Sequence, residues 1–112
     1  MSIVYVVQNQ HRLDASTQRL VPAFDLRPAE RFGRLVYLLG PGANPFGDLD
    51  AMVDDMRRIL FGYTDKDYLL LVGNPVLIGC AVSVASSSGS GKVNLLQWSG
   101  KRRCYLPISV NL

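Results

Sequence analysis

Short apolar runs separated by polar and glycine-rich turns recur along the chain, a pattern that predicts strands. Val93–Trp98 and Cys104–Val110 are joined by a short turn and predict an antiparallel hairpin, with Pro107 favouring an edge position for its second strand. The runs that are apolar on both faces, as is typical of strands in a parallel sheet, are Ile3–Val7, Leu35–Leu39 and Tyr68–Val72.

Two segments have the features of longer helices. From Asp48 to Phe61 the apolar residues recur at helical spacing and form one stripe, so this segment predicts an amphipathic helix. Asn74 followed by Pro75 suits the start of a second helix, which runs to about Ala85 and, being apolar on nearly every side, is expected to be buried. Its β-branched residues also suit a strand, and an interface element is the alternative to a buried helix.

The segments between these elements predict shorter structures. Residues 27–33 predict one or two helical turns, because a proline lies near their start and a glycine at their end. Residues 12–18 are polar and predict a loop, and residues 86–91, which are only serine and glycine, predict a flexible turn. Leu20–Leu26 suits a short edge strand, although Pro22 disfavours it.

Together these elements predict a single small α/β domain over residues 1–112. We expect a mostly parallel sheet, two main helices and a C-terminal antiparallel hairpin. Hydrophobic residues make up 48% of the chain and charged residues 19%, which is a globular composition with enough apolar surface for one core.

The sequence also allows a prediction of where the protein is located in the cell. No apolar run approaches the roughly 20 residues that a membrane-spanning helix needs, and the N-terminus lacks the positively charged lead of a signal peptide. We therefore expect a cytoplasmic protein without a membrane partner. Cys80 and Cys104 are expected to be free thiols, because two cysteines are few for a disulfide scaffold.

The familiar catalytic and cofactor motifs are missing from the sequence. Gly89–Lys92 resembles the end of a phosphate-binding loop, but Ser86 stands where that motif needs glycine and Val93 where it needs serine or threonine. There is no Gly-x-Gly-x-x-Gly run, and His11, the single histidine, has no nucleophile near it in sequence. We predict no catalytic residue, no metal site and no cofactor, and enzymatic activity is not expected.

Polar or glycine-rich residues follow each predicted strand. If the first four strands are parallel, these residues meet at one edge of the sheet, where α/β proteins bind ligands. Amides there can recognise a ligand without titrating, although any α/β domain also needs polar turns to leave its strands. The candidate ligand-binding or partner-binding residues are Gln8, Asn9, Gln10, His11, Gly40, Gly42, Gly73, Asn74, Gln97 and Trp98.

The turn of the predicted C-terminal hairpin is a second candidate site. The formal net charge of the chain is +3, six of its nine acids lie in residues 48–67, and residues 92–103 hold four cations and no acid. A cationic turn with aromatic neighbours can neutralise phosphates and stack bases. The alternative is a solvated turn whose tryptophan packs in the core. The candidate nucleic-acid-binding or anion-binding residues are Lys101, Arg102, Arg103 and Tyr105, beside Trp98.

Segments spread over most of the chain resemble small uncharacterised proteins encoded by tailed bacteriophages. The resemblance lies in residues 7–11, 67–79, 94–100 and 105–108. It implies a phage accessory protein made in the bacterial cytoplasm, where thiols stay reduced, and it implies no activity, because that family has none assigned.

These observations lead to three hypotheses about function. The first is a non-enzymatic small binding protein, a phage accessory factor that engages a host protein or nucleic acid. The alternative is a small-molecule-binding or nucleotide-handling domain that uses the polar strand ends. The third is a structural role as a homo-oligomer.

Overall fold

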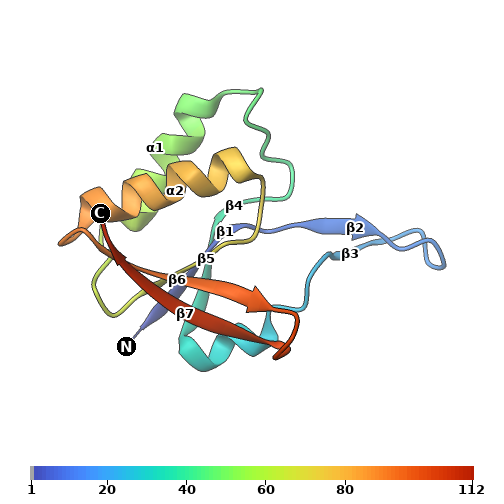
Figure 1. Ribbon diagram of the computed structural model, residues 1–112. Coiled ribbons are helices and arrows are strands. Elements are labelled where there is room, and N and C mark those ends of the chain that lie inside the picture. Colours follow the sequence, from blue (N-terminus) through green and yellow to red (C-terminus); the bar gives the residue numbers. More distant parts are fainter. Residues whose placement is uncertain (1) are drawn as a thin grey trace.

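Four parallel strands and one antiparallel strand form the sheet that organises the chain (Figure 1). The computed structural model describes residues 2–112, and within them the strand order is β4-β1-β5-β6-β7. β1, β4, β5 and β6 are parallel, and β7 is antiparallel to β6, which confirms the predicted α/β fold with its C-terminal hairpin. The strands are β1 (Ile3–Gln8), β4 (Arg34–Leu39), β5 (Tyr68–Leu70), β6 (Lys92–Ser99) and β7 (Cys104–Asn111).

Two helices pack side by side on one face of the sheet (Figure 1). α1 (Leu49–Leu60) follows Asp48, whose carboxylate accepts a hydrogen bond from the N–H of Ala51 at 3.0 Å. α2 (Pro75–Ser88) follows Asn74, whose side-chain oxygen accepts from the N–H of Val76 at 2.9 Å. Both helices are confirmed, and the larger core between them and the sheet includes Tyr5, Val7, Met56, Leu60, Leu69, Leu77, Ala81, Ala85 and Val93.

α2 differs from its prediction in length and in burial. The helix continues through Ser86 and Ser87 to Ser88, where a flexible turn was predicted, because the three hydroxyls donate to carbonyl oxygens three or four residues earlier. A helix buried on every side was also expected. That prediction is wrong, since only one side packs against α1 and the sheet, and Val76 is 50% exposed.

The opposite face of the sheet carries a smaller core. Residues 23–26, which we call the strap, lead across it to the 3-10 helix η1 (Arg27–Phe32), and η1 confirms the predicted helical turns. The N–H of Ala23 donates to the carbonyl oxygen of Gln10 at 2.8 Å and so fixes the start of the strap. The buried residues of this core are Val4, Val6, Ala29, Leu70, Leu96 and Tyr105.

Between β1 and the strap the chain forms a two-stranded arm that projects from the body of the protein (Figure 1). It consists of β2 (His11–Leu13) and β3 (Leu20–Pro22), paired antiparallel. The loop predicted over residues 12–18 is therefore wrong at its start. The polar turn closes the arm instead, because Asp14 accepts hydrogen bonds from Ser16 and from the N–H of Gln18.

Pro107 protects one edge of the sheet. The N–H of Leu71 donates to the carbonyl oxygen of Leu96 at 3.3 Å, so the backbone groups of Leu96 point toward β5 and away from β7. Leu96 lies opposite Pro107, which means that the backbone of Pro107 faces the open edge. The missing N–H of the proline costs no hydrogen bond there and hinders pairing with another chain. The predicted edge position of this strand is confirmed.

Candidate functional site

The turns that follow the four parallel strands lie at one end of the sheet, as expected from their parallel order. Three hollows open around them, and Gln10 lines all three. The strap–β4 cavity, of about 490 Å³, lies between the strap and β4. The strap–hairpin cavity, of about 600 Å³, lies between the strap and the β6–β7 hairpin. The helix-side hollow, of about 490 Å³, is bordered by Gly42, Phe46 and Asn74.

Gln8 holds the turns together from inside the protein. It is 3% exposed, and its side-chain nitrogen donates to the carbonyl oxygens of Gly40 at 3.3 Å and Ala43 at 2.9 Å. Its side-chain oxygen accepts from the N–H of Asn74 at 3.0 Å. Gly73 packs so close to Gln8 that an added Cβ would lie 2.7 Å from the Cβ of Gln8. These contacts give Gln8 and Gly73 a structural role at this end of the sheet.

Asn74 and Gly42 line the helix-side hollow, whereas Gly40 lies in the same turn without lining it. The side-chain oxygen of Asn74 is engaged in capping α2, which gives this residue a structural role at the start of the helix. Gly40 and Gly42 are exposed, and a Cβ added at either would meet open space. Neither glycine is therefore required there for a close backbone approach.

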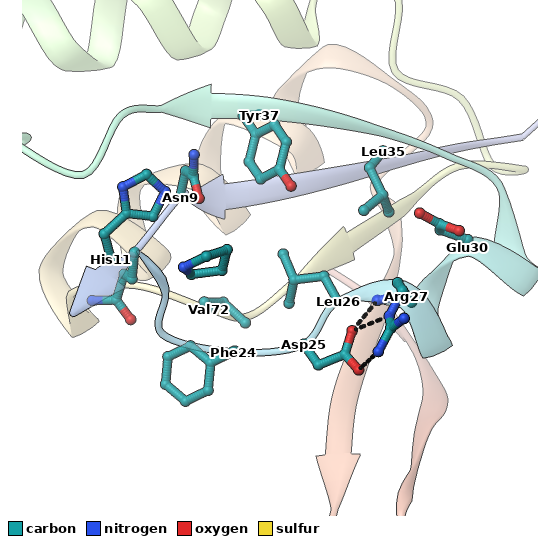
Figure 2. Close-up of a pocket in the computed structure, with 12 residues that line it drawn as sticks. Asn9, His11, Phe24, Asp25, Leu26, Arg27, Glu30, Leu35, Tyr37 and Val72 are labelled. Carbon is teal, nitrogen blue, oxygen red and sulfur yellow. Dashed lines mark hydrogen bonds and ion pairs between the residues drawn. The ribbon is translucent and has the colours of Figure 1, made fainter. Parts of the chain in front are cut away.

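Figure 2 shows the strap–β4 cavity. Asn9 and His11, from the end of β1 and the start of the arm, lie on one side of it, and Tyr37 from β4 lies above. Asp25 and Arg27 lie at the other side and form a two-point ion pair, with both nitrogen–oxygen distances 2.9 Å. The polar groups around this cavity are therefore the imidazole of His11, the amides of Asn9 and Gln10, the phenol of Tyr37, the carboxylate of Glu30 and the Asp25–Arg27 ion pair.

The Asp25–Arg27 pair has a measurable signature. Hydrogen bonds from the side chain and the backbone N–H of Arg27 lower the pKa of the Asp25 carboxyl to about 2. Because the folded-state pKa is lowered, the pair stabilises the native state at neutral pH, and this contribution is lost as the pH falls from about 4 toward 2. A ¹³C NMR titration should give a midpoint near 2 for Asp25, and Arg27→Ala should move it back toward 3.8. A midpoint near 3.8 in the unmodified protein would contradict this pairing.

The strap–hairpin cavity is lined by three aromatic side chains, the guanidinium of Arg103 and the carboxylate of Asp25, whose charge is paired with Arg27. Trp98 and Tyr105 lie opposite each other on β6 and β7, with ring centroids 5.1 Å apart and planes at 68°. Trp98 is 46% exposed at the rim, so it does not pack in the core, whereas Tyr105 is 5% exposed. Phe24 of the strap is 52% exposed and lines the cavity together with Arg103. Burial, and to a smaller extent the negative charge of Asp25, raise the pKa of Tyr105 above its ordinary value, so its hydroxyl stays neutral.

The turn beside this cavity is cationic and solvent-exposed. Lys101, Arg102 and Arg103 are all exposed, and none of them forms an ion pair within residues 2–112. The N–H of Arg103 donates to the carbonyl oxygen of Ser99 at 2.7 Å, which fixes the tight turn. Gln97 lies in β6, is exposed and lines none of the three hollows, whereas Trp98 lines the strap–hairpin cavity.

The charges of the chain divide between two regions. The arm, strap, η1, β4 and the β6–β7 turn, residues 9–37 and 101–103, hold eight of the twelve cations and three of the nine acids. The other six acids lie in residues 48–67, in and around α1. Arg57 and Arg58 of α1 are paired with acids of the same helix. The excess of positive charge therefore lies away from α1, on the arm, η1, the start of β4 and the hairpin turn.

Several residues around the strap carry no distinctive signal in the sequence. Phe24, Asp25 and Arg27 reach the site only because the arm returns the chain to the sheet, and Tyr37 faces the cavity because of its position on β4. The apolar residues on both sides of the polar turn, at Leu13 and Leu20, are the one pattern that could have indicated the hairpin.

Within residues 2–112 the structure brings together no three histidine, cysteine or acidic side chains that could hold a metal ion. In the same range, no helix is long and apolar enough to cross a membrane. Cys80 and Cys104 are both unpaired, as expected.

Comparison with known proteins places the chain among phage proteins. No curated protein and no solved structure matches it. A family model described as phage Pam3 gp32-like protein matches residues 2–112, nearly the whole chain. This match confirms the resemblance to small phage proteins, and it carries no assigned activity. The chain therefore belongs to the family of phage Pam3 gp32-like proteins.

Proposed function

We propose that this protein is a non-enzymatic binding protein that engages nucleic acid in the cytoplasm of the infected bacterium. The observation that supports the proposal is the strap–hairpin cavity, where Phe24, Trp98 and Tyr105 surround an apolar floor and Arg103 borders the opening. Aromatic faces next to cations are the combination that binds bases and phosphates together. Membership of a phage family and two free thiols agree with a cytoplasmic setting.

The placement of charge supports an anionic polymer as the partner. Arg12 and Arg19 lie on the arm, and Lys101, Arg102 and Arg103 lie on the hairpin turn. Both elements project from the carboxyl end of the sheet, because β2 follows β1 and the turn follows β6 (Figure 1). A phosphate backbone crossing this end would meet cations on both sides of the cavity. The release of its counterions would then drive binding.

Fluorescence anisotropy with a labelled oligonucleotide tests the proposal. Binding should weaken as salt rises from about 50 to 200 mM. Changing Lys101, Arg102 and Arg103 together to alanine should lower the affinity at least about tenfold, and should flatten the slope of log affinity against log salt by roughly 2 to 3, since each lost phosphate contact removes about 0.7 to 0.9.

A matched control removes the same net charge elsewhere. Changing Arg57, Arg58 and Lys66 to alanine also lowers the charge by three, but two of these cations are paired on α1 and all lie outside the proposed site. That variant should keep the salt slope of the unmodified protein. Equal losses in both variants would show that only the net charge matters, and the proposed site would then be rejected.

A further inference from the structure

We infer that the strap–hairpin cavity takes an unpaired base stacked against Trp98, so the protein prefers single-stranded to duplex nucleic acid. This inference rests on the proposed function and specifies its ligand. A volume of about 600 Å³ falls within the range of small-molecule pockets, which is about 300 to 1,000 Å³. A cavity of that size suits individual bases and is unlike an open surface that follows a double helix.

The position of Trp98 suits stacking. Tyr105 is buried beside it in an edge-to-face contact, which holds the indole in place from one side. The Trp98 residue keeps 46% of its surface open to solvent, at the cavity rim. An aromatic surface that is held in advance and left uncovered loses little conformational freedom when a base stacks on it.

The opposite wall completes the cavity. Phe24 comes from the strap and is 52% exposed, so a second aromatic ring is accessible from the same opening. Leu70 and Leu96 on the sheet form an apolar floor. The half-buried Gln10 also lines the cavity, and its amide can bond the edge of a base.

Duplex bases cannot use this arrangement. Their faces are already stacked on neighbouring pairs, and moving one into a pocket costs a few kcal/mol of stacking and pairing. In a single strand that cost is small, and each base has a face that can stack on an aromatic side chain. Arg103, which lines the cavity, and the exposed Lys101 and Arg102 of the same turn can bind the phosphates on either side of the inserted base.

The single tryptophan makes the test direct. Because Trp98 is the only tryptophan of the chain, its intrinsic fluorescence reports this site alone. An unlabelled thymidine oligonucleotide should quench that fluorescence, whereas a duplex of the same length should bind more weakly and quench less. Trp98→Ala should lower single-strand affinity roughly tenfold with the salt slope unchanged, and Trp98→Phe should recover most of the loss.

Phe24→Ala provides a second variant on a different element and should also weaken single-strand binding without changing the salt slope. Far-ultraviolet circular dichroism checks that both alanine variants fold. If oligonucleotides bind with the expected salt dependence but single strands and duplexes bind equally and leave the Trp98 fluorescence unchanged, the inference is overturned while the proposed function stands. If no nucleic acid binds even at low salt, both are overturned.

Discussion

Replacing Asp67 with alanine is expected to lower the free energy of unfolding by about 3 kcal/mol, because a buried carboxylate with three hydrogen bonds is lost. Asp67 is 3% exposed. One of its oxygens accepts from the N–H of Ile3 at 2.9 Å, and the other accepts from the N–H and the hydroxyl of Thr64 at 2.9 and 3.0 Å. The side chain therefore ties the start of β1 to the turn that precedes β5.

The loss of stability in Asp67→Ala comes mainly from backbone N–H groups that lose their acceptor. Alanine would leave the N–H groups of Ile3 and Thr64 without acceptors and would open a gap beneath them. Tyr63 lies next to this cluster and links it to β6, since its hydroxyl donates to the carbonyl oxygen of Asp67 at 3.2 Å and accepts from the N–H of Asn94 at 3.1 Å. Loosening the turn should weaken these bonds as well.

Urea unfolding at neutral pH provides the measurement. Asp65→Ala is the matched control, because Asp65 lies in the same turn but is exposed and bonds only the hydroxyl of Ser90 through its side chain. The Asp65→Ala change should lower the free energy of unfolding by less than about 1 kcal/mol. Asp67→Asn should fall between the two, since the amide keeps one acceptor oxygen and loses the other. Similar losses for the Asp67→Ala and Asp65→Ala variants would contradict a special role for the buried carboxylate.

The second large effect is expected at Gln8. Changing Gln8 to leucine keeps the volume but removes the hydrogen bonds to Gly40, Ala43 and Asn74, and we expect a loss of about 2 kcal/mol in the free energy of unfolding. The N–H of Asn74 lies just before α2 and would lose its acceptor, so the junction between β5 and α2 should become the most weakened part of the fold.

Gln97→Leu makes the same chemical change at an exposed position of β6 and should alter stability by less than about 0.5 kcal/mol. Amide hydrogen exchange can locate the effect of Gln8→Leu, because protection should fall around Asn74 before it falls elsewhere. If Gln8→Leu unfolds at the same urea concentration as the unmodified protein, the hydrogen bonds of Gln8 do not stabilise the fold.

Local periodicity was enough to predict most elements of this fold. The stripe of residues 48–61 predicted α1, and the doubly apolar runs predicted strands for the interior of a parallel sheet. The parallel order then implied that the polar turns would meet at one end of the sheet. These predictions were successful because each depends on short-range spacing and on rules of chain connection that hold for any sequence.

The tertiary structure decided what each polar residue does. Gln8 ends β1 and Asn9 follows it directly, yet the Gln8 side chain is buried and bonds residues of two other turns, while Asn9 lines an open cavity. Because successive residues of a strand point to opposite faces, only the packing around β1 determines which amide turns inward. β3 lies within the short strand that Leu20–Leu26 suggested, but β2 and its pairing with β3 were missed, since a strand pattern only three residues long cannot be told from a loop.

The sequence alone therefore determined the α/β class, the order of the elements and the presence of a cationic, aromatic hairpin turn. Only the tertiary structure showed that the strap brings Phe24 to the same cavity as Trp98 and that about half of the Trp98 surface is exposed there. The physical reason is distance along the chain: spacing rules act over a few residues, whereas this cavity joins side chains more than 70 positions apart, from 24 to 98, whose meeting depends on how the whole sheet packs.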